Sequence, residues 1–204
     1  YTITSGATGT DVVDLCDGSV IDLIWVSGTF DGECSFDMTD QYGTSVATFA
    51  DGSVYADGDT IQTFTASCSP PAAPDLVITE IMYNPPESGT DSLEFFEIYN
   101  NDVSTVDMSG YTLDYNGNVH TFASGTNIAA SDYVVVAIDS AKFEAFYGYD
   151  PIQSTSAIGV GNGGATVTLY DSFSQIVNQL TYDDNAPWPT EPDGTGPSLV
   201  LCDP

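Results

Sequence analysis

The sequence predicts an all-β protein made of two tandem modules, and three observations support this prediction. Apolar and polar residues alternate along many short runs, which is the period of a β-strand. Nineteen glycines and eleven prolines separate these runs, as expected for short strands joined by turns. A proline-rich segment, residues 69–74, divides the chain into two parts. Because 42% of the residues are apolar, each part has enough material for a core.

The first module covers residues 1–68 and is expected to be a small β-sandwich. In its first strand Leu23 and Trp25 share one face, and in its second Phe36 and Met38 point inward. Glycine-containing turns separate the strands. The expected strands are 20–26, 34–40, 44–49, 53–56 and 60–66. Residues 69–74, SPPAAP, follow as a linker that its three prolines make stiff and extended.

The second module, residues 75–204, is organised around two runs, 76–83 and 93–100, that a Pro/Gly turn joins. Strict alternation places Val77, Thr79, Ile81 and Tyr83 on one face of the first run, and Ile78, Glu80 and Met82 on the other. In the second run Glu94 and Glu97 have opposite parity, so they are expected on opposite faces. Further strands are expected near 106–113, 119–122, 125–128, 165–170, 175–182 and 198–202.

One strand and one helix of the second module have distinct patterns. Residues 134–138 are apolar without alternation, which predicts a central strand covered on both faces. Asp139 is a helix N-cap residue and Gly148 a helix terminator, so one short helix is expected between them. Helical spacing places Phe143, Phe146 and Tyr147 on one face of that helix.

The second module also resembles a known family. The motifs ITEIMYNPP, EFFEIYN, DMSGYTL, YDDNAPWP and DGTGPSLVL follow one another between residues 76 and 201. In this order and spacing they resemble the bacterial lamin tail domain family. The resemblance implies an immunoglobulin-like β-sandwich that is usually one module of a larger exported protein, and it implies no reaction.

The first module has a resemblance of its own. Its segment CDGSVIDLIWVSGTFDGECSFDMTDQYG is similar to a β-rich repeat of secreted Bacteroidota proteins. In related repeats a Gly-Asp-Gly-Trp stretch follows the turn, whereas here Thr44 and Ser45 follow Gly43. This difference argues against a cation site of that type.

The charge of the chain restricts its partners. Thirty acidic residues face one basic residue, Lys142, which gives a formal net charge of −29. Nucleic acid and anionic membrane surfaces are poor partners, because almost no cation is present to replace their counterions. No apolar run reaches the roughly 20 residues that span a bilayer, so no direct membrane insertion is expected. A protein or a surface glycan is the expected partner, and a saline exterior would screen the self-repulsion.

An exported chain in an oxidising setting would tend to pair its cysteines. The four cysteines allow three connectivities, of which we expect Cys16 with Cys68, since they flank the main body of the first module. Three stretches also match the Asp-Ser/Thr-apolar pattern that Bacteroidota use for O-glycosylation. The modified residues would be Thr60, Ser92 and Ser140.

Calcium is the one expected cofactor, because it takes hard oxygen ligands and is abundant outside cells. The expected ligands are Glu80, Asp91, Glu94 and Glu97, although strand parity allows at most two of them to share a site without a bulge. Alternatively, Glu80 or Glu97 accepts hydrogen bonds from loop amides at the end of the sandwich. A second candidate set is Asp31, Asp37 and Asp40.

No catalytic set is expected. His120 is the only histidine and lies within a strand, where a structural role is the rule. The glycine-rich stretch 159–164, GVGNGG, lacks the lysine of a phosphate-binding loop and is expected to be a turn. Among so many acids, neighbouring carboxylates arise by coincidence.

These observations predict a non-catalytic module for adhesion or assembly in a larger secreted or cell-surface bacterial protein. Two alternatives stay open. The chain can be an accessory to an exported hydrolase such as a nuclease, with the chemistry in another domain. It can also be a calcium-stabilised subunit of a surface filament or layer.

Overall fold

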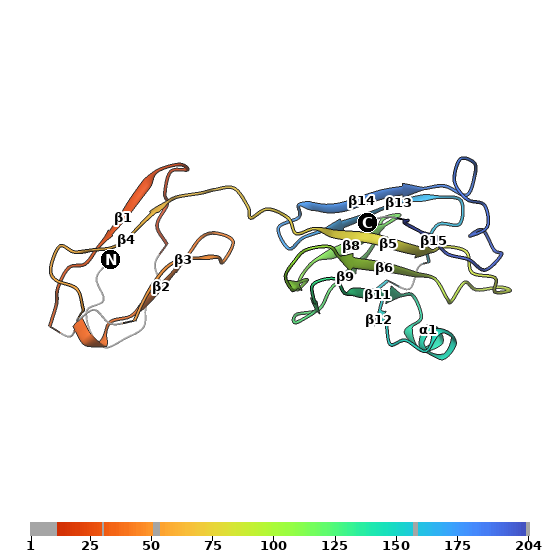
Figure 1. Cartoon of the computed structure of the whole chain (residues 1–204), viewed down its shortest axis with the longest axis horizontal. Coiled ribbons are helices and arrows are strands. Elements are labelled where there is room, and N and C mark those ends of the chain that lie inside the picture. Colours follow the sequence, from red (N-terminus) through yellow and green to blue (C-terminus); the bar gives the residue numbers. More distant parts are fainter. Residues whose placement is uncertain (1–11, 30, 51–53, 157–158, 203–204) are drawn as a thin grey trace. The chain divides into compact units, whose positions relative to one another are not determined.

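The computed structural model describes residues 12–29, 31–50, 54–156 and 159–202. The chain separates into two compact units, Tyr1–Pro71 and Ala72–Pro204, so the division falls inside the proline-rich segment. Figure 1 shows the strands of each unit. In the described part of the chain, no helix has the length and apolar character needed to cross a membrane.

The first unit contains two antiparallel ladders. Strand β1 (Val20–Ile24) pairs with β4 (Thr60–Thr65), and β2 (Phe36–Thr39) pairs with β3 (Ser45–Phe49). A short 3₁₀ turn, η1 (Asp31–Glu33), precedes β2. Phe49 is buried, and the rings of Trp25, Phe36 and Tyr55 lie 5.0, 4.8 and 5.7 Å from it. The prediction of a strand at 53–56 is wrong, because residues 54–56 do not form a strand. Ser53 lies outside the described residues.

The second unit is a sandwich of two sheets (Figure 1). One sheet has the strand order β12-β11-β6-β5-β15 and the other β14-β13-β8-β9, while β7 and β10 form a separate short ladder. The strands are β5 (Leu76–Met82), β6 (Phe95–Asn100), β7 (Val106–Asp107), β8 (Thr112–Tyr115), β9 (Asn118–Thr121), β10 (Asn127–Ile128), β11 (Tyr133–Ala137), β12 (Ile152–Gln153), β13 (Ala165–Tyr170), β14 (Ile176–Tyr182) and β15 (Leu199–Val200). The prediction of an immunoglobulin-like all-β fold is confirmed.

The pairing of β5 with β6 contains one extra residue. Ile78 lies opposite Ile98, but the next pair is Glu80 with Glu97, so Thr79 is bulged out of the ladder. The bulge reverses the parity of β5, and strict alternation is therefore wrong beyond Ile78. Leu76, Ile78, Ile81 and Tyr83 all reach the main core between the sheets, whereas Met82 reaches the opposite face.

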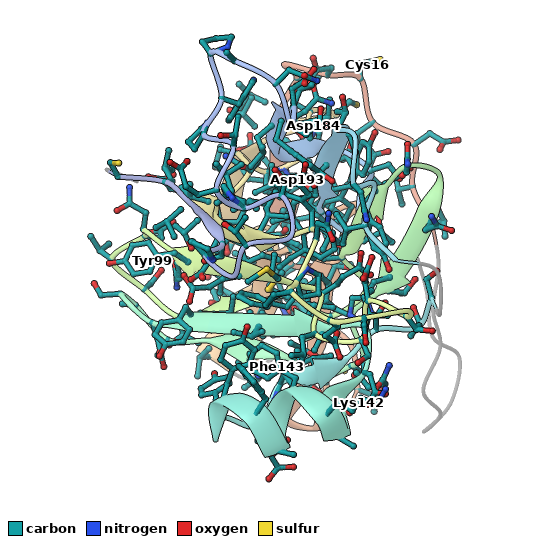
Figure 2. The ribbon with its side chains drawn as sticks, turned by 90° about the vertical axis from the view of Figure 1, so that its right-hand side faces the viewer. Cys16, Tyr99, Lys142, Phe143, Asp184 and Asp193 are labelled. Carbon is teal, nitrogen blue, oxygen red and sulfur yellow. The ribbon has the colours of Figure 1, made fainter. Side chains whose placement is uncertain are left out.

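Strand β11 is covered on both faces, as its apolar run predicts. Val136 packs into the main core, while Val135 and Ala137 pack against Phe143 of helix α1 (Ser140–Tyr147). Figure 2 shows Phe143 between the helix and the sheet. Asp139 caps the helix by accepting a hydrogen bond from the Lys142 amide, and Gly148 ends it.

The predicted apolar face of α1 is only partly correct. Phe143 is buried, but Phe146 is 67% exposed, because the helix is short and covers only one end of the sheet. Its ring lies against Tyr147 rather than against a strand.

A buried amide ties two loops to the sheet at the other end. Asn100 is fully buried, and its side-chain nitrogen donates to the carbonyls of Ser104, Ile128 and Ala129 at 2.8–3.0 Å. Its side-chain oxygen accepts from the Asp102 amide at 2.9 Å. One side chain thus satisfies main-chain carbonyls at the end of β10 and in two loops.

Asn100→Ala should destabilise the second unit by about 3 kcal/mol, because it leaves several buried polar groups without partners. Urea unfolding followed by tyrosine fluorescence measures the change. The neighbouring Asn101, which bonds Asp75 at the surface, provides the control. Asn101→Ala should cost less than about 1 kcal/mol, and equal effects of the two substitutions would contradict this account.

Candidate functional site

The structure separates the four carboxylates expected to bind calcium. Glu80 and Glu97 are cross-strand partners in β5 and β6. The Thr79 hydroxyl donates to Glu97 at 2.6 Å, and the Ser198 hydroxyl donates to Glu80. Asp91 and Glu94 instead line a cavity that contains neither of the other two. The four therefore form no single site, and within the described ranges no three acidic, histidine or cysteine side chains are grouped to hold a metal ion.

Glu94 is the residue of this set whose environment is unusual. It precedes β6, is only 2% exposed, and its Oε1 accepts a hydrogen bond from the Val160 amide at 3.0 Å. Its other oxygen, Oε2, is buried and has no hydrogen-bond partner. A polar atom buried without a partner is costly, so Glu94 is a candidate functional residue.

The glycine-rich loop covers Glu94. A side-chain carbon added at Gly159 would lie 2.1 Å from Glu94 Oε2, so only glycine fits there. The Tyr182 hydroxyl holds the loop by donating to the Gly161 carbonyl at 2.7 Å. The sequence suggested a turn here but gave no sign that the turn closes over a carboxylate, because the two segments are 66 positions apart.

The cavity beside Glu94 has a volume of about 610 Å³. Side chains from the turn before β6, from the start of α1, from β12 and from the glycine-rich loop line it, namely Thr90, Asp91, Ser92, Glu94, Ile138, Asp139, Lys142, Gln153, Gly159, Val160 and Asn162. Lys142 lies at its rim, 3.8 Å from the Asp139 carboxylate and 59% exposed. Figure 2 shows Lys142 at the side of α1.

Burial raises the pKa of Glu94 to about 8, and the nearby Asp91 and Glu87 charges add to this shift, while the Val160 amide opposes it. Glu87 shows the contrasting case. Burial acts to raise its pKa as well, but hydrogen bonds from Ser92 and Leu93 outweigh burial and lower the pKa. The expected loop-amide contacts thus fall on Glu94 and Glu87, whereas the hydrogen bonds that the described residues give to Glu80 and Glu97 come from hydroxyl groups.

His120 is a second buried side chain with an unpartnered polar atom, Nε2, but it does not line the cavity beside Glu94. It lies in β9, is 1% exposed, and its Nδ1 accepts from the Thr155 amide at 3.0 Å. The ring stands edge-on to Phe122 with centroids 4.6 Å apart. Burial lowers the pKa of His120 to about 4, so the imidazole is neutral at pH 7.

A second hollow lies between β5 and β14. It has a volume of about 290 Å³ and is lined largely by apolar side chains, including Leu180, Trp188 and Leu199. Asn178 of β14 reaches across it to accept from the Ile78 amide at 3.3 Å. At its rim Val200 and Leu201 are 57% and 47% exposed.

The expected disulfide between Cys16 and Cys68 is not formed, and both thiols are exposed. The backbone does bring the two segments together, since the Cys68 amide donates to Asp17 at 2.9 Å and the Gly18 amide to the Ala66 carbonyl. Cys16 itself lies before the turn at residues 17–18, which carries it off the ladder.

The second expected acidic set is engaged in local hydrogen bonds. Asp31 accepts from the Gly28 amide, Asp37 from the Ser45 hydroxyl, and Asp40 from the Tyr42 and Thr44 amides. The contacts of Asp31 and Asp40 are typical of turns, and that of Asp37 joins β2 to β3.

The three expected glycosylation residues differ in exposure. Thr60 is exposed at the start of β4, and Ser140 is half-buried at the start of α1. Ser92 is 4% exposed and its hydroxyl donates to Glu87 at 2.6 Å, which leaves no room for a glycan in the folded protein.

The family model of the lamin tail domain matches residues 69–184, from the proline-rich segment to the loop after β14. No curated protein matches the chain.

Gly159→Ala should destabilise the second unit by about 2 kcal/mol, because the new methyl group meets the Glu94 carboxylate and moves the loop. Gly163 lies in the same loop with open space around it, so Gly163→Ala is the control and should change stability by less than about 0.5 kcal/mol. Chemical unfolding of both variants at pH 7 measures the difference. A Gly159→Ala variant as stable as Gly163→Ala would show that the loop does not close on Glu94.

His120 should make the protein less stable as the pH falls. The unfolded chain takes up a proton near pH 6.5, but the folded chain does so only near pH 4, so acid favours unfolding between these values. Glu94 has the opposite effect, because its pKa is raised on folding. The contribution of His120 is therefore isolated as the stability of the wild type minus that of His120→Gln.

This difference should be constant above pH 6.5 and fall by about 3 kcal/mol between pH 6.5 and 4. Urea unfolding at constant ionic strength with a chelator present measures it. A difference that does not change with pH would mean that the imidazole is accessible to water.

Proposed function

Because the chain belongs to the lamin tail domain family, we propose that it is a structural and interaction module of a larger bacterial protein at the cell surface. The lamin tail domain is an immunoglobulin-like domain that generally has no catalytic role and often serves interaction. The net charge of −29 supports an exported location, since a saline exterior screens such a charge. It also makes nucleic acid a poor partner.

The observation that carries the proposal is the groove between β5 and β14. Strand β14 ends the four-stranded sheet, so its outer edge has no strand partner among the described residues. An apolar hollow lies directly beside this edge. An edge strand next to an apolar hollow offers main-chain hydrogen bonds and a side-chain pocket together, which is the combination that extended protein segments use in strand addition.

The proposed partner is therefore a protein segment, from a neighbouring domain or subunit. A surface glycan is the alternative partner, because Trp188 and the polar side chains of Asn178 and Gln179 also line the hollow. The larger part of the lining is aliphatic, which favours an extended protein segment. Exposed Val200 and Leu201 at the rim would be covered in the complex.

Site-specific photo-crosslinking in the full-length protein on intact cells tests the proposal. A photoreactive phenylalanine analogue at Val200 should give one defined adduct with a protein, because this position lies at the groove. The same analogue at Val103 is the control, since Val103 is 95% exposed in the loop after β6 and does not line the groove.

The adduct should disappear when intact cells are treated with protease before irradiation. Equal crosslinking from both positions, or none from Val200, would contradict an interface at the groove. Adducts that survive external protease would contradict the surface location.

A further inference from the structure

The cavity beside Glu94 has the features of a cation-binding site that the proposed function does not use. Glu94 lines the cavity, and only 2% of the residue is exposed to solvent. Oε1 is satisfied by the Val160 amide, but Oε2 has no donor. A buried carboxylate oxygen without a donor is stabilised by a cation more than by any other group of similar size.

Other side chains that line the cavity supply further oxygen ligands. Asp91 and Asn162 both line it, and the Asn162 amide nitrogen donates to Asp91 Oδ2 at 3.1 Å. Rotation of the Asn162 amide about its last bond would present its oxygen in place of its nitrogen. Thr90, which carries a hydroxyl group, lines the same cavity. Two carboxylates with amide, hydroxyl and water oxygens make up a ligand set that calcium accepts.

Lys142, the one basic residue of the sequence, does not neutralise Glu94. Lys142 lines the cavity but lies 3.8 Å from Asp139, and it is not among the charges that act on Glu94. Every other lining side chain with a charge is acidic. A metal cation that binds Glu94 must therefore come from solution, where it competes with a proton for the carboxylate.

We propose that the cavity beside Glu94 binds one calcium ion, with Glu94 Oε2 and Asp91 as charged ligands and Asn162 as a neutral ligand. Calcium suits the cavity better than magnesium, because magnesium requires a compact octahedral set, whereas the cavity of about 610 Å³ has room for the larger and more variable coordination of calcium. The ion joins the turn before β6 to the glycine-rich loop. Among the described residues, two hydrogen bonds also connect these segments, one between Val160 and Glu94 and one between Asn162 and Asp91. This site is independent of the groove between β5 and β14.

Calcium titration of the whole chain by calorimetry, in buffer with 150 mM NaCl, tests the proposal. The salt concentration of about 0.15 M screens diffuse binding to the many surface acids. One saturable site is expected, with a dissociation constant on the order of 10⁻⁴–10⁻³ M, as in other extracellular calcium modules. Calcium should also raise the midpoint of thermal unfolding, and a chelator should reverse the shift.

The matched variants are Glu94→Gln and Glu97→Gln. Each removes one negative charge of the thirty, so general attraction of cations changes equally. Only Glu94 lines the cavity, whereas Glu97 pairs with Glu80 on another face of the sheet. Glu94→Gln should weaken calcium binding at least about tenfold, and Glu97→Gln should leave it within about twofold. Asp91→Asn, at a half-buried position, replaces Glu94→Gln if that variant does not fold.

Terbium gives an independent measurement of position. Tyr182 lies close enough to Glu94 for the carboxylate to act on its pKa, so excitation of tyrosine should sensitise terbium bound in the cavity. Calcium should displace the terbium, and so remove the sensitised emission, in the wild type and in Glu97→Gln.

Three results would overturn the proposal: equal calcium affinity of the two glutamate variants, an affinity for magnesium equal to that for calcium, or the absence of a saturable site. If lysine amide displaced the bound terbium and calcium did not, the cavity would be a site for an organic ammonium group, and the calcium proposal would be overturned as well.

Discussion

The second unit depends on how β5 pairs with β6. Both strands are central in the five-stranded sheet, and one bulged residue, Thr79, lets β5 serve two cores. On one face Ile78 and Ile81 join the main core, although three positions separate them and strict alternation would place them on opposite faces. On the other face Met82 packs with Phe95 beneath α1. Without the bulge at Thr79, the apolar side chains of β5 that now pack in one of these cores would point to the opposite face of the sheet.

The same bulge explains where the carboxylates of this strand pair lie. Because the register shifts by one residue, Glu80 comes opposite Glu97, and each accepts a hydrogen bond from a neighbouring hydroxyl. Two like charges directly opposite each other destabilise a ladder unless such donors or solvent compensate them. The pair therefore needs its hydroxyl donors for stability, and these leave it poorly placed to bind an ion with Glu94.

A chain with thirty acids and one lysine cannot neutralise its carboxylates with ion pairs. It uses main-chain amides instead. Asp139 caps α1, Asp171 accepts from two amides in the β13–β14 turn, and Glu87 holds the turn before β6. Each such acid satisfies amides that the turns would otherwise leave unpaired, so the acidity has a structural use as well as a role in solubility. Glu94 is the exception, because only one of its oxygens receives an amide and the other is buried.

The sequence by itself determined the elements that depend on neighbours along the chain. Alternation located the strands, the unbroken apolar run identified β11 as a strand buried on both faces, and Asp139 and Gly148 marked the ends of α1. Motif order also identified the family. Each of these depends on local periodicity, capping or turn chemistry, which a single segment carries. Tertiary structure alone decided the bulge at Thr79 and the closure of Gly159 over Glu94. These features arise where segments far apart in the chain meet, and local patterns contain no information about which distant backbone will approach a given side chain.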